Sequence, residues 1–271
     1  MISIISICLF LFNESTTFLV SQSTTIEPAV IECRYLENVM VDTLSKRIVG
    51  DTLILKAGRM SSAFYSKDLF FRDSLTAQPG GKEKLRRLML QYAREGRMSE
   101  LTSNTSEYIY QNWPEGSITT RAKLEDLPVE FTEERELPEW TLMDSSKIIL
   151  GYECQMAEAD FRGRRWIAWY STAVPISIGP WKLWGLPGLI FEAYDSKKEY
   201  SYSMTSISAE FPGEVVVFDW LGKGGKYTAI TRKKYLRAYL GMESINAETA
   251  KESGLGDFVT ERNYDLRERD Y

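Results

Sequence analysis

The chain contains no histidine among its 271 residues, and that absence removes several kinds of active site. Without an imidazole there can be no Ser-His-Asp triad, no Cys-His dyad and no histidine-ligated metal centre. The G-x-S-x-G, S-x-x-K and P-loop motifs are missing as well. Catalysis would have to rest on carboxylates, lysine, tyrosine or cysteine. We therefore expect no metal, no cofactor and no catalytic residue of a recognised type.

A long basic tract is also missing. The chain carries 33 Lys and Arg against 38 Asp and Glu, and both signs are interspersed to give a net charge of −5. A nucleic-acid-binding surface needs clustered Lys and Arg along the phosphate backbone. Nucleic acid is therefore excluded as a partner.

No segment is long and apolar enough to span a bilayer, and the only extended apolar run stands at the start of the chain. Residues 1–12 are apolar apart from two serines, and a polar break at 13–17 precedes Phe18. This length suits the hydrophobic region of a secretory signal. We expect a signal peptide over 1–21, cleaved after Ser21. Cys8 lies too early and follows Ile7, so we expect no lipidation and no transmembrane segment in the mature chain.

What the chain has in quantity is aromatic residues, at 13% of the total, and these favour pleated, half-buried strands. Several runs read as hairpins, among them 108–124 around Pro114-Glu115-Gly116, and 189–208. Two segments have helical periodicity instead, Lys82–Arg97 and the stretch capped by Thr231.

These patterns predict one domain over 22–271 of mainly β (α+β) class. We expect a curved, partly closed antiparallel sheet with two covering helices. The aromatic stretch Ser61–Leu75 favours a further pair of strands. The charged stretch Glu261–Tyr271 is expected to be loose.

Two cysteines remain after the leader, Cys33 and Cys154, both in predicted strands. In an oxidising compartment they could pair as a disulfide. They could equally remain two separate buried thiols that behave as small hydrophobic side chains. Pairing requires the two Cβ atoms to meet, so spacing alone leaves both alternatives open.

The densest group of motifs lies between Gly151 and Asp195. Gly151-Tyr152, Phe161-Arg162-Gly163-Arg164, Ala168-Trp169, Pro175-Ile176 and Gly179-Pro180 precede the hexamer Gly185-Leu186-Pro187-Gly188-Leu189-Ile190. This succession resembles the GLPGLI family, which the hexamer names. The resemblance implies an exported protein of Bacteroidetes-type envelopes, in the periplasm or associated with the outer membrane. It implies no established activity, and it suggests an outer-membrane transporter or another envelope protein as partner.

Residues 174–190, here called the signature loop, have a composition that explains a rigid fold. The prolines fix φ and the glycines permit positive φ or close backbone approach. The residues that define the signature loop are Gly179, Pro180, Gly185, Leu186, Pro187, Gly188, Leu189 and Ile190. The indoles of Trp181 and Trp184 lie three residues apart.

Two interpretations of this loop stay open. In one, it closes an end of the sheet with buried indoles. In the other, it forms a platform for a peptide or glycan ligand, made of Arg162, Arg164, Trp169, Trp181 and Trp184. The arginines flank Gly163 in a tight turn, where exposed side chains are usual.

The sequence therefore favours an exported, non-enzymatic binding or accessory protein, with a link to outer-membrane transport. One alternative is a carboxylate-dependent hydrolase acting on glycans, which needs no histidine. Its candidate acids are Glu153, Glu158, Asp160, Glu192 and Asp195. A purely structural envelope protein is the other alternative.

Overall fold

The computed structural model describes residues 23–222, 225–241 and 266–270. The predicted signal peptide lies outside the described residues. Within them, no helix is both long and apolar enough to cross a membrane.

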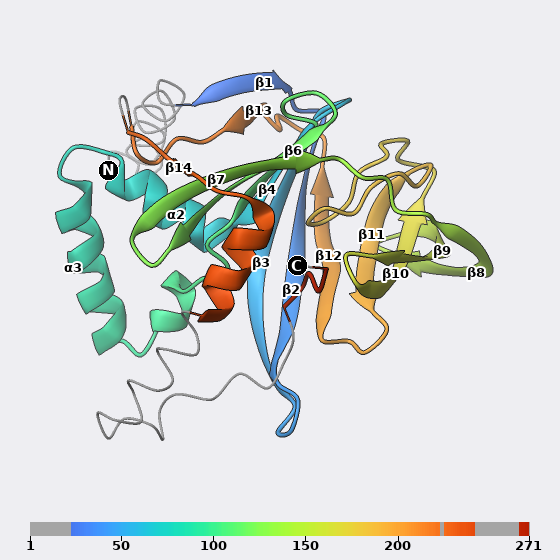
Figure 1. Cartoon of the computed structure of the whole chain (residues 1–271), viewed down its shortest axis with the longest axis horizontal. Coiled ribbons are helices and arrows are strands. Elements are labelled where there is room, and N and C mark those ends of the chain that lie inside the picture. The colour runs from blue at the N-terminus through green and yellow to red at the C-terminus, as the bar shows by residue number, and fades with distance from the viewer. Residues whose placement is uncertain (1–22, 223–224, 242–265, 271) are drawn as a thin grey trace, which may run out of the picture.

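Most of the described chain is a single large sheet (Figure 1). Its first half is β2 (Ile31–Asp42), β3 (Arg47–Ala57), β4 (Ser62–Ser66), β5 (Tyr108–Gln111), β6 (Ser117–Leu124) and β7 (Leu127–Glu134). Its second half is β8 (Thr141–Ile149), β9 (Tyr152–Phe161), β10 (Arg164–Ser171), β11 (Leu189–Asp195) and β12 (Tyr200–Ser208). With the short β14 (Thr228–Ala229), the order is β14-β7-β6-β5-β4-β3-β2-β12-β11-β10-β9-β8. A separate ribbon pairs β1 (Thr24–Pro28) with β13 (Glu214–Val217).

The sheet is strongly curved, as the length of one connection shows. Strands β7 and β8 stand near opposite ends of the order, ten strand spacings apart, yet only residues 135–140 join them. Ten spacings of about 4.8 Å would place the two strands almost 50 Å apart in a flat sheet. The connection can reach at most about 25 Å. The sheet must therefore curl so that its ends approach, which confirms the predicted curved, mainly β architecture. Its strand pairs are antiparallel as predicted, except that β14 runs parallel to β7.

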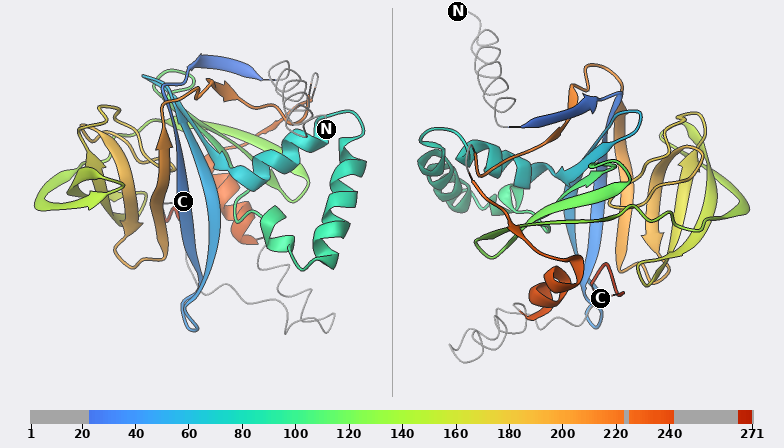
Figure 2. Two further views of the ribbon diagram at one scale, coloured as in Figure 1. Left: turned by 180° about the vertical axis from the view of Figure 1, so that it is seen from behind. Right: turned by 45° about the horizontal axis from the view of Figure 1, so that its top comes forward.

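Helices lie on both sides of the first half of the sheet (Figures 1 and 2). They are α2 (Lys67–Thr76), α3 (Gly81–Arg94), the 3₁₀ turn η1 (Met98–Leu101) and a helix over residues 232–241. The second and fourth of these match the two predicted helices. Helix α2 packs on the face that carries Tyr65 and Tyr108, whereas the last helix packs on the opposite face, against Phe131. Thr231 caps the last one, since its Oγ1 accepts the backbone N–H of Lys234 at 3.3 Å.

The stretch Ser61–Leu75 corrects the expectation of a strand pair, because only Ser62–Ser66 is a strand and α2 follows directly. Ser66 explains the switch. Its hydroxyl accepts the backbone N–H of Leu69, and Asp68 stands in the first helical turn. This N-cap outweighs the strand preference of the aromatic residues.

Three apolar clusters hold the fold together. The largest fills the concave side of the curved sheet and includes Tyr35, Phe64, Trp166 and Trp181. The second joins β4 and β5 to β13. The third packs Tyr235 and Leu236 of the last helix, with Leu266, against β6 and β7. The signature loop belongs to the first cluster.

Candidate functional site

The signature loop is anchored in the core of the protein by its own apolar side chains. Ile178, Trp181, Leu183 and Leu186 are all buried. The Trp181 ring lies 5.3 Å from that of Trp166 and meets it at a tilt. Trp181 holds this position with φ at +56°, a conformation that a bulky residue rarely adopts. The backbone is therefore shaped to place this indole inside.

Glycine at 188 is required by close packing. A Cβ at that position would stand 2.1 Å from the carbonyl oxygen of Ser171. Only glycine lets the loop return against the end of β10 before it enters β11.

The other predicted platform tryptophans lie elsewhere. Trp184 is half-buried on the outside of the loop, where its indole N–H donates to the carbonyl of Glu136 at 2.9 Å. Trp169 is half-buried, alternates with the inward-facing Trp166 and Ala168, and lies beneath the ammonium of Lys147 at 4.2 Å. The structure therefore does not bring Trp169, Trp181 and Trp184 onto one face.

Both arginines of the β9–β10 turn are buried, contrary to the usual exposure of such a pair. Arg164 donates to Asp195 at 2.9 Å and to Glu199 at 2.7 Å. Arg162 pairs with Glu133 at 2.7 Å and with Asp270 at 3.3 Å. Their guanidinium groups are therefore committed to carboxylates within the chain.

Lys182 of the signature loop was not expected as a site residue, yet it is the centre of a buried charge cluster. Its ammonium pairs with Glu133 and with Glu268, both at 2.5 Å. Burial alone would lower the pKa of Lys182, but these two carboxylates outweigh it and hold the pKa above its usual value. Glu268 also pairs with Arg232 at 2.6 Å. Although burial disfavours its charge, the two cations hold the pKa of Glu268 below its usual value.

Segment 266–270 supplies much of this cluster, which corrects the expectation that the stretch Glu261–Tyr271 is loose. Residues 261–265 and 271 lie outside the described residues. Within 266–270, Leu266 and Glu268 are buried. The segment runs between the signature loop and the helix over 232–241.

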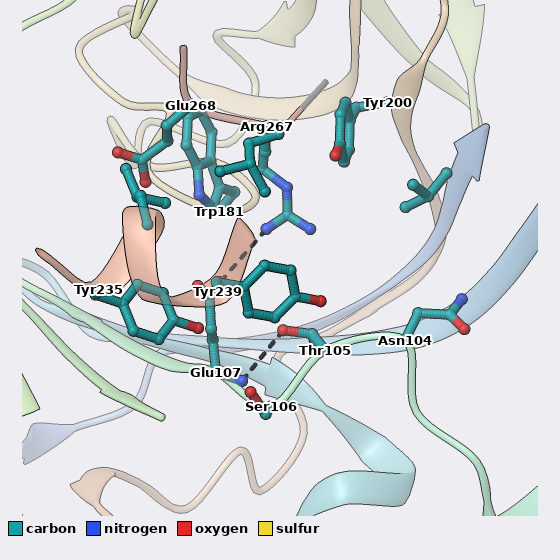
Figure 3. A pocket seen from close by; sticks show the side chains of 13 residues that line it. Asn104, Thr105, Ser106, Glu107, Trp181, Tyr200, Tyr235, Tyr239, Arg267 and Glu268 are labelled. Carbon is teal, nitrogen blue, oxygen red and sulfur yellow. Dashed lines mark hydrogen bonds and ion pairs between the residues drawn. The ribbon is translucent and has the colours of Figure 1, made fainter. Parts of the chain in front are cut away.

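A cavity of about 80 Å³ opens beside Trp181 (Figure 3). Aromatic rings of Trp181, Tyr200, Tyr235 and Tyr239 surround it, with Asn104, Thr105, Ser106, Glu107, Arg267 and Glu268 as polar lining. Figure 3 shows the guanidinium of Arg267 pointing between the rings toward Glu107. The Arg267 group is already compensated, because its Nη2 lies 2.6 Å from Glu37.

A larger open cleft of about 990 Å³ adjoins the cavity and shares Asn104, Thr105, Ser106 and Tyr239 with it. Its other walls come from α2, the start of α3, the end of β6 and Trp220. Its charges are mixed, with Arg72, Lys82 and Lys123 facing Asp73, Glu125 and Asp126. The shared residues form a common wall between the cavity and the cleft.

The acids singled out from the sequence stand away from both hollows. Glu158 pairs with Arg165, Glu192 with Lys147, and Asp195 with Arg164. Glu153 and Asp160 are exposed strand residues. None of the five lines the cavity or the cleft.

Cys33 and Cys154 are buried free thiols in the structure. Cys33 belongs to β2 and Cys154 to β9, and three strands stand between these two in the sheet. The disulfide alternative is therefore not the arrangement that the structure holds. Burial raises the pKa of the Cys33 thiol to about 12 and that of Cys154 to about 11.

Comparison with known proteins gives a match to one family model and a likeness to one solved fold. Residues 162–192 match a family model described as "Protein of unknown function (Porph_ging)". No curated protein matches. The matched stretch contains Arg162, Arg164, Lys182 and the hexamer at 185–190.

Among solved structures, a protein named PNGF-II is similar in its C2 and P21 crystal forms, each with a TM-score of 0.50. The identity is 15% and 13%, over 79% and 78% of this chain. The match covers 33% of the PNGF-II chain, so this chain spans about a third of its length. At such identity the likeness shows the β-rich fold alone. Residues 162–192 of this chain are thus similar to a family whose function is unknown.

Proposed function

We propose that this chain is an exported envelope protein of the GLPGLI kind that acts by binding rather than by catalysis. The hexamer at 185–190 lies inside the stretch that matches the unknown-function family, which supports the relationship. The proposed location is the periplasm or an association with the outer membrane. The proposed partner is an outer-membrane transporter or another envelope protein.

The cavity beside Trp181 carries this proposal. Aromatic walls with a few convergent polar groups are the usual lining of a small-ligand site. The charges at the cavity are paired with one another, which favours a neutral polar ligand over an ion. Flat rings and hydrogen-bonding groups in a cavity of about 80 Å³ suit one polar edge of a sugar unit or a short peptide side chain. The adjoining cleft would hold the rest of such a ligand.

The charges of the cavity argue for binding rather than acid–base chemistry. A glycoside hydrolase needs one carboxylic acid that stays protonated near neutral pH. Glu268 has the opposite property, because Lys182 and Arg232 hold its pKa below the usual value. Glu107 is paired with Arg267 at 3.7 Å.

One observation favours the hydrolase alternative. Glu37 and Asp51 stand opposite each other on β2 and β3, and both are buried. Burial raises the pKa of each, and the charge of Asp51 raises that of Glu37 further. Acid–base catalysis uses a pair of carboxyl groups of which one keeps a raised pKa, and Glu37 has that property. Arg267 and Asn104, which bind these two acids, line the cavity.

The test is a fluorescence titration of the mature chain with neutral oligosaccharides and with short peptides, combined with mass spectrometry of the same mixtures. We expect a saturable change in tryptophan emission that is weakened at least tenfold by Tyr239→Ala. Tyr194→Ala, on the outer side of β11 and away from the cavity, is the matched control. Unchanged ligand after long incubation is expected. Cleaved ligand, lost in Glu37→Gln, would support the hydrolase, and a flat titration would support a structural role.

A further inference from the structure

Segment 266–270 is held by charges from all around it, although residues 242–265, which precede it, lie outside the described residues. Arg267 pairs with Glu37 at 2.6 Å and Arg269 with Glu199 at 2.9 Å. Glu268 pairs with Lys182 at 2.5 Å, and Asp270 with Arg232 at 2.6 Å. The cations of the segment thus meet acids from β2 and the β11–β12 turn. Its acids meet cations from the signature loop and the last helix.

Alternate side chains therefore leave the segment toward two different sets of partners. Such alternation is the property of an extended chain, in which successive side chains point to opposite sides. The rest of the protein presents acids to the two arginines of the segment and bases to its two acids. We call the residues that do this, Glu37, Arg162, Arg164, Lys182, Glu199 and Arg232, the slot.

The slot also binds the backbone of the segment. Arg164 donates from Nη2 to the carbonyl of Leu266 at 2.7 Å and from Nε to that of Arg267 at 3.1 Å. The backbone N–H of Arg269 donates to the carbonyl of Arg162 at 2.9 Å. Gly163 allows this approach, since a Cβ there would stand 2.7 Å from the Cβ of Arg269.

The relation between slot and segment is that of a receptor and its peptide. The ion-pair partners named above lie between 38 and 230 positions away in the chain. An apolar anchor begins the segment, because Leu266 is buried against Tyr235, Leu236 and Phe131. Side-chain pockets for specificity and main-chain hydrogen bonds for affinity are the two parts of peptide recognition.

We propose that the slot is a peptide-binding site for an extended segment in which an apolar residue is followed by alternating Arg and Asp or Glu. In this structure the chain fills the slot with its own residues 266–270. The ligand class follows from the charges that the slot presents. This inference does not depend on the proposed function, because no ligand in the cavity is needed for it.

The first test uses the full chain with Arg267, Glu268, Arg269 and Asp270 all changed to alanine, so that its own segment no longer competes. A dye-labelled peptide Leu-Arg-Glu-Arg-Asp is added and its fluorescence anisotropy is followed. We expect saturable binding and a higher melting temperature of the protein. The control peptide Leu-Glu-Arg-Asp-Arg has the same composition with the charges out of step, and it should bind at least tenfold more weakly. Equal binding of both peptides, or none to the folded variant, would overturn the proposal.

A second experiment serves if the fourfold variant does not fold. A specific protease site is introduced between residues 242 and 265, and the folded chain is cut there. We expect the released fragment to remain bound and then to exchange with an excess of labelled Leu-Arg-Glu-Arg-Asp, but not with the control peptide. Lys182→Glu in the same chain should abolish exchange, and the peptide Leu-Arg-Lys-Arg-Asp should restore it. A fragment that dissociates at once would contradict the proposal.

Discussion

Lys182 and Glu268 form an ion pair of 2.5 Å in which the two side chains are only 2% and 7% exposed. The pair joins residues 86 positions apart and connects the signature loop to segment 266–270. Lys182 belongs to the stretch that matches the unknown-function family. Part of that stretch therefore serves to hold another part of the same chain.

Replacing Lys182 by methionine should be strongly destabilising. The change removes the cation that Glu133 shares with the buried Glu268 and leaves only Arg162 and Arg232 to pair with these acids. Removing one partner of a buried pair costs roughly 3–5 kcal/mol. The free energy of unfolding in urea measures the effect. Lys233→Met, at an exposed position of the last helix, is the matched control and should change stability by less than about 0.5 kcal/mol. A loss below about 1 kcal/mol for Lys182→Met would show that the two acids find other compensation.

Gly163→Ala should weaken the docking of segment 266–270. Gly163 has φ of +74°, and its Cβ position is blocked by Arg269. Gly116 has a similar φ of +76° with nothing within 4 Å, so Gly116→Ala measures the backbone strain alone. That strain is roughly 1–2 kcal/mol. We expect Gly163→Ala to cost about 1 kcal/mol more than the control in urea unfolding. Equal losses would mean that Arg269 moves aside freely.

Trp181→Ala and Trp184→Ala should differ, although both change the same loop. Trp181 is 1% exposed and packs against Trp166 and Phe161, so its truncation should cost roughly 3–5 kcal/mol. Trp184 is half-buried and should cost roughly 1–2 kcal/mol. Thermal and urea unfolding of the two variants make the comparison. A larger loss for Trp184→Ala would place the main anchor of the loop on its outer side.

The docking of segment 266–270 should be insensitive to pH near neutrality and should fail in acid. The cations Lys182 and Arg232 hold the pKa of Glu268 below its ordinary 4.5, and Arg232 and Arg162 hold that of Asp270 below its ordinary 3.8, both against the opposing effect of burial. Stability from a carboxyl group with a lowered folded-state pKa is present above its unfolded pKa and is lost as pH falls through the folded value.

The measurement compares the free energy of unfolding of the unchanged chain with that of the double variant Glu268→Gln, Asp270→Asn at a series of pH values. The stability difference should stay constant from about pH 8 to 5 and shrink below about pH 4.5. Glu37, which faces Arg267 and Asp51, acts in the opposite sense because burial raises its pKa. Its unfavourable contribution is present in both proteins and cancels in the difference. A difference that changes between pH 5 and 8 would contradict the assignment.

The two buried thiols should be unreactive in the native protein. Thiolate is the reactive form, and burial raises the pKa values of Cys33 and Cys154 to about 12 and 11. In a chain that carries Cys8→Ser, we expect no reaction with Ellman's reagent at pH 8 and two thiols per chain in urea. A single species that never reacts without reductant would reveal a disulfide instead.

Much of the fold could be predicted from the sequence because its strands and helices follow from local patterns. The hairpin at 108–124 has its turn residues at 114–116, and the helix over 232–241 begins at the cap that Thr231 supplies. Helix α2 was missed because Leu69, Phe70 and Phe71 resemble a strand. The capping hydroxyl of Ser66 and the acidic Asp68 were the available signal.

The candidate site was predicted less well, because its charges come together only in the folded sheet. Arg162 and Arg164 were identified, but as exposed turn residues. Their carboxylate partners lie 26 (162 minus 136) to 108 positions away, from Glu136 to Asp270, beyond any local pattern. The alternation Leu-Arg-Glu-Arg-Asp at 266–270 was a usable sign of an extended chain bound from two sides.

The order of the strands predicts how the protein folds. From β2 to β7, and from β8 to β12, every strand pairs with its neighbour in the chain, so each half of the sheet can assemble from consecutive strands. The halves meet where β2 pairs with β12, and there Tyr200 opposes Val39, 161 positions away (200 minus 39). Contacts this distant slow folding because a long loop must first close. We therefore expect two meanders to form early and to join in the slow step. Segment 266–270, bound to Glu37 on one side of the join and Glu199 on the other, then closes over it.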